Sequence, residues 1–137
     1  MVLGIGIDLV ETARISRAIA AHGERFEKRV FTEDERATCR GRKDRLLALA
    51  ARFAAKEACL KALGTGWSAG LSLQQIEVVR EKNGRPGLRL HGASAERARK
   101  LGVGTVHVSL THQSKVAAAV VVLEGRSGGV DLAVAGQ

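Results

Sequence analysis

Two carboxylates stand inside otherwise apolar segments of this 137-residue chain, and any fold must accommodate them. Asp8 interrupts the apolar run over residues 2–10, and Glu57 interrupts the apolar stripe of a helix expected over residues 46–63. Burying a carboxylate is costly unless a cation or hydrogen bonds compensate its charge. Two such acids, about fifty residues apart in the chain, predict a metal ion shared between two segments.

The run over residues 2–10 has the pattern of a β-strand. Side chains alternate along a strand, so the aliphatic residues at the odd positions from 3 to 9 share one face. Asp8 then lies on the opposite face, together with Gly4 and Gly6. We expect the two glycines to leave space beside the carboxylate.

The helix expected over residues 46–63 carries apolar side chains at helical spacing. Glu57 occupies a position on that core-facing stripe, and Lys61 follows one turn later on the same side. An ammonium at this spacing can neutralise Glu57 or bind whatever Glu57 binds. Either segment alone would fit a simpler alternative, such as a surface Glu–Lys pair, whereas the two together favour a shared metal.

Two longer motifs contain these acids: residues 4–11 (GIGIDLVE) and residues 52–66 (RFAAKEACLKALGTG). They resemble the two signature motifs of the phosphopantetheinyl transferases, and specifically of the holo-acyl-carrier-protein synthase family. Further matches follow in order along the chain at Arg14-Ile15, Arg25-Phe26, residues 29–32 and residues 107–112. The resemblance covers roughly residues 2–124 as one unit, and it implies the fold of that family.

The resemblance implies an enzyme that moves the 4′-phosphopantetheine arm of coenzyme A onto a serine of apo-acyl carrier protein and releases adenosine 3′,5′-bisphosphate. Such a phosphoryl transfer needs its charge neutralised, and Mg²⁺ suits the task because it accepts carboxylate, water and phosphate oxygens. The implied catalytic residues are Asp8 and Glu57, which hold Mg²⁺, and Lys61, which contacts the pyrophosphate and stabilises or protonates the departing nucleotide. Glu57 or a metal-bound water could deprotonate the serine.

Three residues in or just after the helix are candidates for binding coenzyme A. Arg52 and Lys56 lie one turn apart, on a different face from Glu57, and we expect both to contact phosphate. Gly64 directly follows the helix and can end it in a left-handed conformation. A glycine there also lets a ligand approach the backbone, and the two roles are compatible.

A histidine-containing strand near the C-terminus supplies two further candidates. His107 and Ser109 alternate onto one face of this strand, whereas His112 falls on the other face. The resemblance implies that His107 contacts a phosphate of coenzyme A, with Ser109 on the same face. The alternative is a structural histidine bonded to backbone, and we favour that alternative for His112.

The chain is basic, with a formal charge of +8 from 22 Lys+Arg against 14 Asp+Glu. A basic surface speeds encounter with acidic partners. By resemblance, an acidic acyl carrier protein docks on Arg14, Arg17, Arg25, Phe26, Lys28 and Arg29. The alternative is an ordinary solvated basic face. Because aromatic residues make up 3% of the chain and tyrosine is absent, a stacking platform for single-stranded nucleic acid is not expected.

Two functions compete with the transferase. A catalytically silent docking module for acidic carrier proteins would explain the basic surface, but it would not need Asp8, Glu57 and Lys61 together. A basic nucleic-acid-binding domain leaves the two acids within apolar segments unexplained. The transferase is therefore the favoured function.

The predicted fold class is α+β, a mostly antiparallel sheet with helices packed against it. Strands are predicted over residues 2–10, 76–81, 88–91, 106–110 and 116–123. One helix should follow the first strand and end at about residue 21, and a second should begin at a capping box that starts with Thr32. Two further helices are predicted over residues 46–63 and 94–101. We expect one domain over residues 1–124 and a loose, glycine-rich tail over residues 125–137.

The resemblance also implies a homotrimer with active sites at subunit boundaries. The N-terminal apolar run lacks a basic lead and contains Asp8, so a signal peptide is not expected. No uncharged stretch is long enough to span a bilayer. Together with two cysteines that lack metal-ligand spacing, these features predict a cytoplasmic location.

Overall fold

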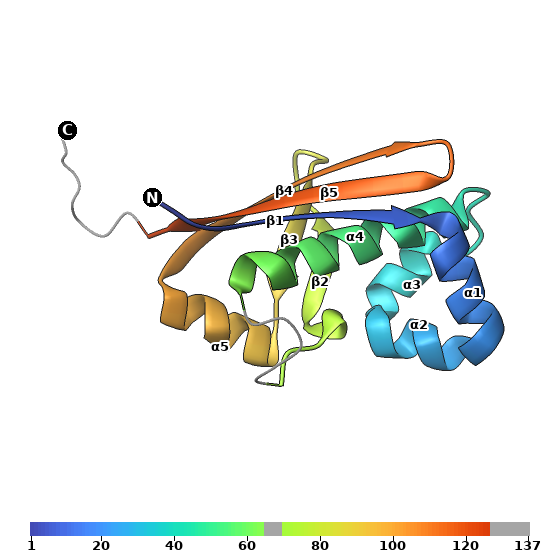
Figure 1. Cartoon of the computed structure of the whole chain (residues 1–137), viewed down its shortest axis with the longest axis horizontal. Helices are drawn as coiled ribbons and strands as arrows, with labels where there is room; N and C mark the ends of the chain where they lie inside the picture. Colours follow the sequence, from blue (N-terminus) through green and yellow to red (C-terminus); the bar gives the residue numbers. More distant parts are fainter. Residues whose placement is uncertain (65–69, 127–137) are drawn as a thin grey trace.

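The computed structural model describes residues 1–64 and 70–126. In chain order, the elements are β1 (Val2–Glu11), α1 (Thr12–His22), α2 (Glu24–Val30), α3 (Glu33–Cys39), α4 (Arg45–Leu63), the 3₁₀ helix η1 (Leu73–Gln75), β2 (Ile76–Arg80), β3 (Pro86–Leu90), α5 (Gly92–Leu101), β4 (Val103–Gln113) and β5 (Val116–Gly125). Figure 1 shows α4 running along the sheet of β1, β4 and β5, with α1, α2 and α3 gathered at one end. The predicted α+β class is confirmed.

The described strands form two antiparallel sheets rather than one. The larger sheet has the order β1-β5-β4, and the smaller is the hairpin of β2 and β3. The central strand β5 is apolar from Val116 to Leu123, as expected for a strand that has a neighbour on each side. The hairpin turns at the Asn83-Gly84 pair, where the sequence predicted it.

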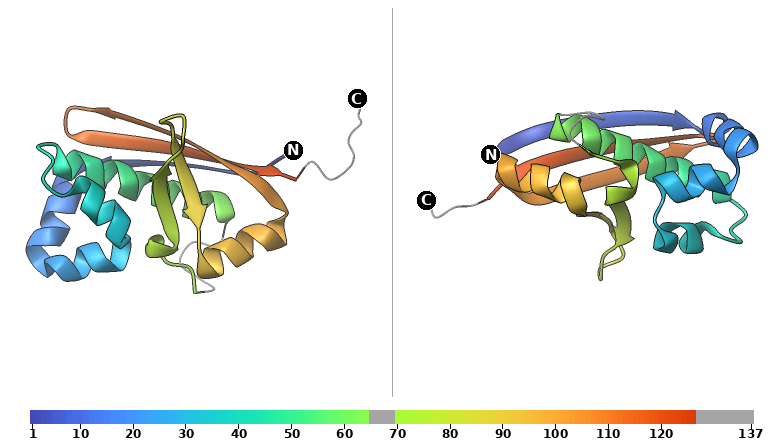
Figure 2. Two further views of the ribbon diagram at one scale, coloured as in Figure 1. Left: turned by 180° about the vertical axis from the view of Figure 1, so that it is seen from behind. Right: turned by 90° about the horizontal axis from the view of Figure 1, so that it is seen from below.

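One face of the larger sheet is covered by α4 (Figure 2). Gly4 and Gly6 of β1 point toward this helix, and a methyl group at either position would overlap the carbonyl oxygen of Ala62 or Ala58. The glycines therefore allow the backbones of β1 and α4 to touch. This result corrects the expectation that they leave space beside Asp8, since the α4 backbone fills that space.

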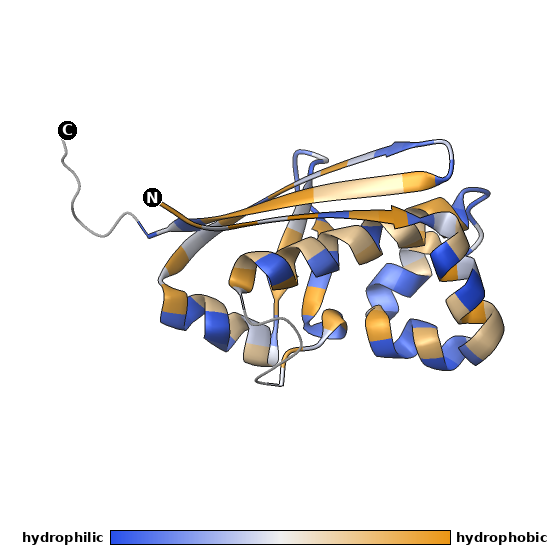
Figure 3. Ribbon diagram, viewed as in Figure 1, coloured by the Kyte–Doolittle hydropathy of each residue, from blue (hydrophilic) through white to orange (hydrophobic). Residues whose placement is uncertain are grey.

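The described part of the single chain leaves the other face of the larger sheet uncovered. Ile5, Ile7 and Leu9 point away from α4 and are 62%, 66% and 66% exposed. Figure 3 shows apolar residues along much of both β1 and β5. A contiguous group of exposed aliphatic side chains is uncommon on the surface of a monomeric protein.

The helices at one end of the molecule pack around three aromatic rings. Phe26 stacks on Phe53 with ring centroids 6.3 Å apart, and it meets Phe31 edge to face at 6.2 Å. Helix α2, which carries Phe26, was not predicted from the sequence. Gly23, with φ of +58°, ends α1 and turns the chain directly into α2, so the two short helices follow each other without a loop.

Most other predicted boundaries agree closely with the structure, but β4 extends three residues further at each end than predicted. Thr32 and Glu35 form the predicted capping box at the start of α3, and α5 begins at Gly92, slightly earlier than expected. Most of the predicted C-terminal tail, residues 127–137, lies outside the described residues. No helix in the described part of the chain combines the length and apolar character needed to cross a membrane.

The contact between β1 and α4 predicts a severe effect of a single methyl group. Gly6→Ala should lower the free energy of unfolding by about 3 kcal/mol, because the added Cβ must displace the α4 backbone rather than a flexible side chain. Urea unfolding followed by circular dichroism, at one fixed protein concentration, measures this change. Lys82→Ala, at an exposed position of the turn between β2 and β3, is the control and should stay within about 0.5 kcal/mol of the parent. A Gly6→Ala protein as stable as this control would contradict the prediction.

Candidate active site

β1 and α4 bring the two predicted acids together with two basic side chains. Lys61 Nζ lies 3.0 Å from Asp8 Oδ1 and donates to the carbonyl oxygen of Ile7 at 2.9 Å. Arg14 Nη2 lies 3.1 Å from Glu57 Oε1. The carboxylate side chains of Asp8 and Glu57 are only 12% and 16% exposed. We call Asp8, Arg14, Glu57 and Lys61 the acid cluster.

The carboxylates of the acid cluster lack enough hydrogen-bond donors. Within the described residues, Asp8 Oδ2 is buried and has no hydrogen-bond partner, while Glu57 Oε1 is buried and has only the 3.1 Å ion pair with Arg14. Burial raises the pKa of Glu57, and the negative charge of Asp8 raises it further, while Arg14 and Lys61 act in the opposite direction. Buried carboxylate oxygens with unshared lone pairs fit a hard divalent cation.

Such a cation would have few protein ligands. Across residues 1–64 and 70–126, no group of three or more His, Cys, Asp or Glu side chains is arranged to hold a metal. The acid cluster offers two carboxylates, which leaves coordination positions for oxygens of water or of a phosphate. Mg²⁺ is commonly bound in this way, through one or two carboxylates together with substrate phosphates.

A second feature is a basic cavity of about 380 Å³. Its positively charged or titratable basic residues are Arg42, Arg52, Arg80, Arg89 and His112. Arg52 Nη1 donates to the carbonyl oxygen of Ala48 at 3.1 Å, while its Nε is buried without a partner among the described residues. Asp34, Asp44 and Glu77 also line the cavity. Asp44 accepts a two-point hydrogen bond from Arg42, and the four arginines outnumber the three carboxylates that line the cavity.

The acid cluster and the basic cavity lie on opposite sides of α4. Ala48 lines the cavity, and Glu57 follows nine residues later, which is about two and a half helical turns, so their side chains leave the helix in opposite directions. The acid cluster lies at β1 and the cavity at β4, with β5 between these strands. Neither Asp8 nor Lys61 belongs to the described lining of the cavity. One chain therefore presents two separate sites.

Lys56 lies in a different environment from the one expected. Its side chain is fully buried, and its ammonium contacts Glu35 Oε1 at 2.6 Å and the carbonyl oxygens of Leu73 and Ile76 at 3.1 and 2.6 Å. These contacts engage all three ammonium donors inside the protein. The buried position of Lys56 gives no support to its expected contact with a phosphate of coenzyme A, because β2 and η1 cover this part of α4. Arg52, one turn earlier, is not covered and lines the cavity.

β4 places its histidines on opposite faces, as the alternation predicted. His107 lies on the uncovered face of the sheet, with Nε2 2.9 Å from Glu124 Oε1, and Ser109 shares that face. His112 lines the basic cavity instead. The histidine that the sequence disfavoured is thus the one beside the arginines. The alternation of side chains along a strand predicts that His107 and His112 lie on opposite faces of β4, but it does not predict which of the two faces borders a cavity.

Gly64 ends α4 in the left-handed conformation that the sequence predicted. Its φ is 82°, and its N–H lies 3.1 Å from the carbonyl oxygens of Leu60 and Lys61. The capping role is confirmed, whereas the expected contact with coenzyme A stays a prediction. The next residues of the motif, 65 and 66, lie outside the described part of the chain.

Comparison with known proteins bears directly on these sites. A sequence model of the 4′-phosphopantetheinyl transferase superfamily matches residues 4–121, which contain the whole acid cluster. The chain belongs to this superfamily. Superfamily relatives named holo-[acyl-carrier-protein] synthase include one from Anaeromyxobacter sp. (strain K), 52% identical over 128 residues, with 91% of this chain and 98% of the relative covered. Another, from Methylobacterium radiotolerans, is 49% identical over 128 residues, with 90% and 94% covered.

Solved structures of superfamily members share the fold. Holo-[acyl-carrier-protein] synthase from Neisseria meningitidis aligns with a TM-score of 0.83 at 32% identity, covering 90% of this chain and 99% of that one. The Helicobacter pylori protein, solved in complex with coenzyme A, aligns with a TM-score of 0.76 at 32% identity, covering 88% and 99%. The family and fold implied by the sequence motifs are therefore confirmed.

The basic residues that the superfamily resemblance assigns to carrier docking lie on α1 and α2. A shallow hollow of about 170 Å³ is lined by His22, Arg25, Phe26 and Arg29. Arg17 and Lys28 are also exposed on these helices. Phe26 is half-buried, because its ring packs against Phe31 and Phe53, so only part of it is available to a partner. Arg14 lies at the acid cluster rather than in the hollow.

The raised pKa of Glu57 predicts a pH-dependent gain in stability when its charge is removed. A carboxyl group with a raised pKa in the folded state favours folding when protonated and opposes it once ionised. Glu57→Gln should therefore raise the melting temperature at about pH 7, and the gain should vanish as the pH falls to the ordinary glutamate value of about 4.3. Thermal unfolding with EDTA, at one fixed protein concentration, measures both points.

Glu124→Gln provides a control, because the pKa of Glu124 is shifted in the opposite direction from that of Glu57. The hydrogen bond from His107 lowers the pKa of Glu124, so neutralising this residue should not raise the melting temperature at either pH. An equal gain at both pH values for Glu57→Gln, or a loss at about pH 7, would contradict the electrostatic origin proposed for the shift.

Proposed function

We propose that this protein transfers the 4′-phosphopantetheine arm of coenzyme A to a serine of apo-acyl carrier protein, giving the holo-carrier and adenosine 3′,5′-bisphosphate. The acid cluster is the observation that carries the proposal, because it joins two motifs that are about fifty residues apart in the chain. Further support comes from the holo-[acyl-carrier-protein] synthases that align with nearly the whole chain, one of them solved with coenzyme A.

Asp8 and Glu57 are the proposed ligands of Mg²⁺. The support is their mutual proximity, their burial and the unpartnered Oδ2 of Asp8 among the described residues. When bound there, Mg²⁺ would neutralise charge on the pyrophosphate oxygens of coenzyme A. Lys61 and Arg14 each contact one of these carboxylates, so they reduce the repulsion between the two acids while leaving Asp8 Oδ2 open.

The basic and acidic side chains of the cluster have complementary proposed roles. In the reaction, the serine oxygen bonds to the phosphorus next to the pantetheine, and the bond from that phosphorus to the oxygen of the departing nucleotide breaks. Glu57 is a proposed acceptor of the serine proton, because its carboxylate belongs to the cluster at the proposed reaction centre. Lys61, whose side chain is 55% exposed, can hydrogen-bond to the departing phosphate.

The basic cavity is the proposed site for the nucleotide half of coenzyme A. The 3′-phosphate and the pyrophosphate are anions, and arginine guanidinium groups bind phosphate oxygens through paired N–H donors. Arg52 has a buried Nε without a partner among the described residues, and Arg89 and His112 lie in the same cavity. Contacts of coenzyme A with Gly64, His107 and Ser109 remain predictions from the sequence.

We further propose that two copies of the chain complete each active site. Within one chain, α4 separates the acid cluster from the basic cavity, so one molecule of coenzyme A cannot reach both through the packed core. The uncovered face with Ile5, Ile7 and Leu9 provides an apolar surface for association. In a homotrimer, a head-to-tail ring would set the acid cluster of each subunit beside the cavity of the next.

The acyl carrier protein is the proposed partner of α1 and α2. Its acidic surface would meet Arg17, Arg25 and Arg29 around the shallow hollow, and the net charge of +8 would speed the encounter. Arg14 lies between this surface and the acid cluster because it also contacts Glu57. We propose a cytoplasmic location for the reaction, which is consistent with the two buried, free cysteines.

Mass spectrometry of an apo-acyl carrier protein tests the proposed reaction. Incubation with this protein, coenzyme A and Mg²⁺ should add one phosphopantetheine to the carrier, and EDTA should prevent the addition. Asp8→Ala should slow the transfer by about a hundred-fold or more, since one of two charged ligands is lost. Glu96→Ala, at an exposed position of α5 that belongs neither to the acid cluster nor to the described lining of the cavity, should leave the rate unchanged.

Transfer that is unaffected by EDTA or by Asp8→Ala would remove the metal assignment. A carrier that binds but is never modified, although another transferase can modify it, would favour the silent docking module instead.

Mixing two inactive variants tests whether the active site is shared. Asp8→Ala lacks a functional acid cluster, and Arg52→Ala has a damaged cavity. Co-expressed in equal amounts, the two chains should form mixed assemblies in which about one quarter of the sites combine an intact cluster with an intact cavity. Transfer activity should therefore reappear. Activity no greater than the sum of the two separately purified variants would show that each chain forms its own site.

A further inference from the structure

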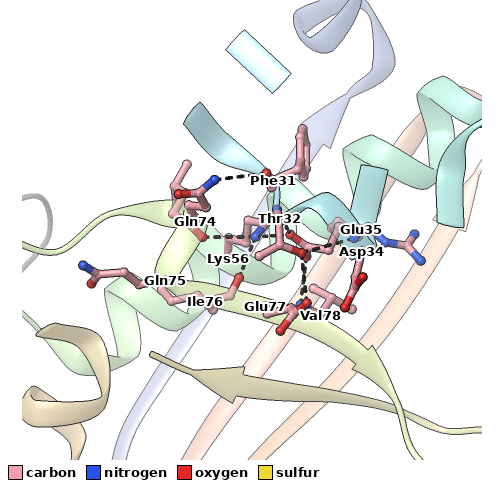
Figure 4. Close-up of polar contacts among 12 residues, drawn as sticks. Phe31, Thr32, Asp34, Glu35, Lys56, Gln74, Gln75, Ile76, Glu77 and Val78 are labelled. Carbon is pink, nitrogen blue, oxygen red and sulfur yellow. Dashed lines mark hydrogen bonds and ion pairs between the residues drawn. The ribbon is translucent and has the colours of Figure 1, made fainter. Parts of the chain in front are cut away.

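Lys56 lies at the centre of a buried polar network that joins three elements (Figure 4). Its side chain is 0% exposed, as is that of Glu35, whose Oε1 lies 2.6 Å from Lys56 Nζ. The same ammonium donates to the carbonyl oxygens of Leu73 and Ile76, at 3.1 and 2.6 Å. Lys56 thus ties α4 to α3 and to the segment that leads from η1 into β2.

Glu35 is used in two ways within this network. Its Oε1 accepts a hydrogen bond from the Thr32 N–H at 2.9 Å, which completes the capping box of α3. Its Oε2 accepts from the Val78 N–H of β2 at 2.8 Å. Beside it, the Thr32 hydroxyl donates to Glu77 Oε2 at 2.9 Å. The first turn of α3 is therefore attached to both α4 and β2.

Stability alone is a weak explanation for a buried ion pair of this kind. Removing both charges from water is costly, and well-packed apolar residues often serve as well or better. Burial accordingly lowers the pKa of Lys56, even though Glu35 acts in the opposite direction. What an apolar pair would not supply is the set of directed contacts to specific carbonyl and N–H groups of β2 and η1.

Three of the elements that Lys56 joins, α3, α4 and β2, form part of the wall of the basic cavity. α3 contributes Asp34 and Thr38, and α4 contributes Ala48, Ala51 and Arg52, one turn before Lys56. β2 contributes residues 77–80, which directly follow the carbonyl group that Lys56 holds. A shift of β2 against α4 would change the separation of Arg52 and Arg80 across the cavity.

We propose that Lys56 is a positioning residue for the coenzyme A site: paired with Glu35, it fixes β2 and α3 against α4 and so sets the spacing of the phosphate-binding arginines. This inference rests on the proposed function, since it takes the cavity to be the nucleotide site. Lys56 itself touches no ligand. Its effect reaches coenzyme A through Arg52 and Arg80.

The test removes both charges while retaining the helix cap. In the double variant Lys56→Met with Glu35→Gln, no unpaired charge is buried, and glutamine can replace glutamate in a capping box. The variant should fold but lose the contacts to Leu73 and Ile76. Its dissociation constant for coenzyme A, measured by calorimetry, should rise about ten-fold, while kcat at saturating coenzyme A changes less than about two-fold.

A matched control separates positioning from general loss of stability. Val121→Ala removes buried volume from β5, away from the network, and should destabilise the protein without weakening coenzyme A binding. Glu35→Asp alone retains both charges of the pair and the two carbonyl contacts of Lys56 but shortens the carboxylate arm, so it should show a smaller rise in the dissociation constant. It serves as the test if the double variant does not fold. Coenzyme A binding equal to the parent in whichever network variant folds would overturn the proposal.

Hydrogen exchange distinguishes failure of this inference from failure of the proposed function. The backbone amides of β2 should exchange faster in the network variant than in Val121→Ala, whether or not coenzyme A is a ligand. If the parent protein does not bind coenzyme A, the proposed function fails. Unchanged exchange in β2 shows instead that Lys56 does not position this strand, and it overturns the inference by itself.

Discussion

The contact between the backbones of β1 and α4 is the constraint on which the rest of the structure depends. Gly4 and Gly6 let the helix lie directly on the strand, and no other residue type fits at these positions without moving it. This close approach places Asp8 against Glu57 and Lys61, although the segments are far apart in the chain. The same approach excludes water from one side of the carboxylates, which raises the pKa of Glu57 and leaves lone pairs available.

Helix α4 presents different chemistry on each of its sides. One side carries the acid cluster, another carries Arg52 at the basic cavity, and a third buries Lys56 against Glu35. A rotation of α4 would therefore disturb all three together. The buried Lys56 network opposes such a rotation, because its contacts run to α3, η1 and β2 rather than along the helix itself. In this protein, which has few aromatic side chains, directed polar contacts fix the orientation of α4, a task that the packing of large apolar side chains performs in a protein with a larger core.

The sequence predicted those features that depend on local pattern. Period-two alternation placed Asp8 with the glycines, helical spacing placed Glu57 near Lys61, and the Thr32 capping box was found where expected. It did not predict the burial of Lys56, because its spacing from Arg52 fits an exposed phosphate contact equally well. Nor did it favour His112 over His107, since the cavity is built by β2, β3 and α3 as well as by β4. These features arise from tertiary packing, which the local pattern does not contain.

The uncovered face of the larger sheet has a consequence for how this protein works in a cell. If each active site combines the acid cluster of one chain with the basic cavity of another, only the assembled protein would be active. Specific activity would then fall on dilution, because dilution favours separate chains by mass action. Under that proposal, newly made chains would be inactive until the faces that carry Ile5, Ile7 and Leu9 meet. Activity would therefore begin only after two newly synthesised chains associate, and the rate of this association depends on the square of the chain concentration.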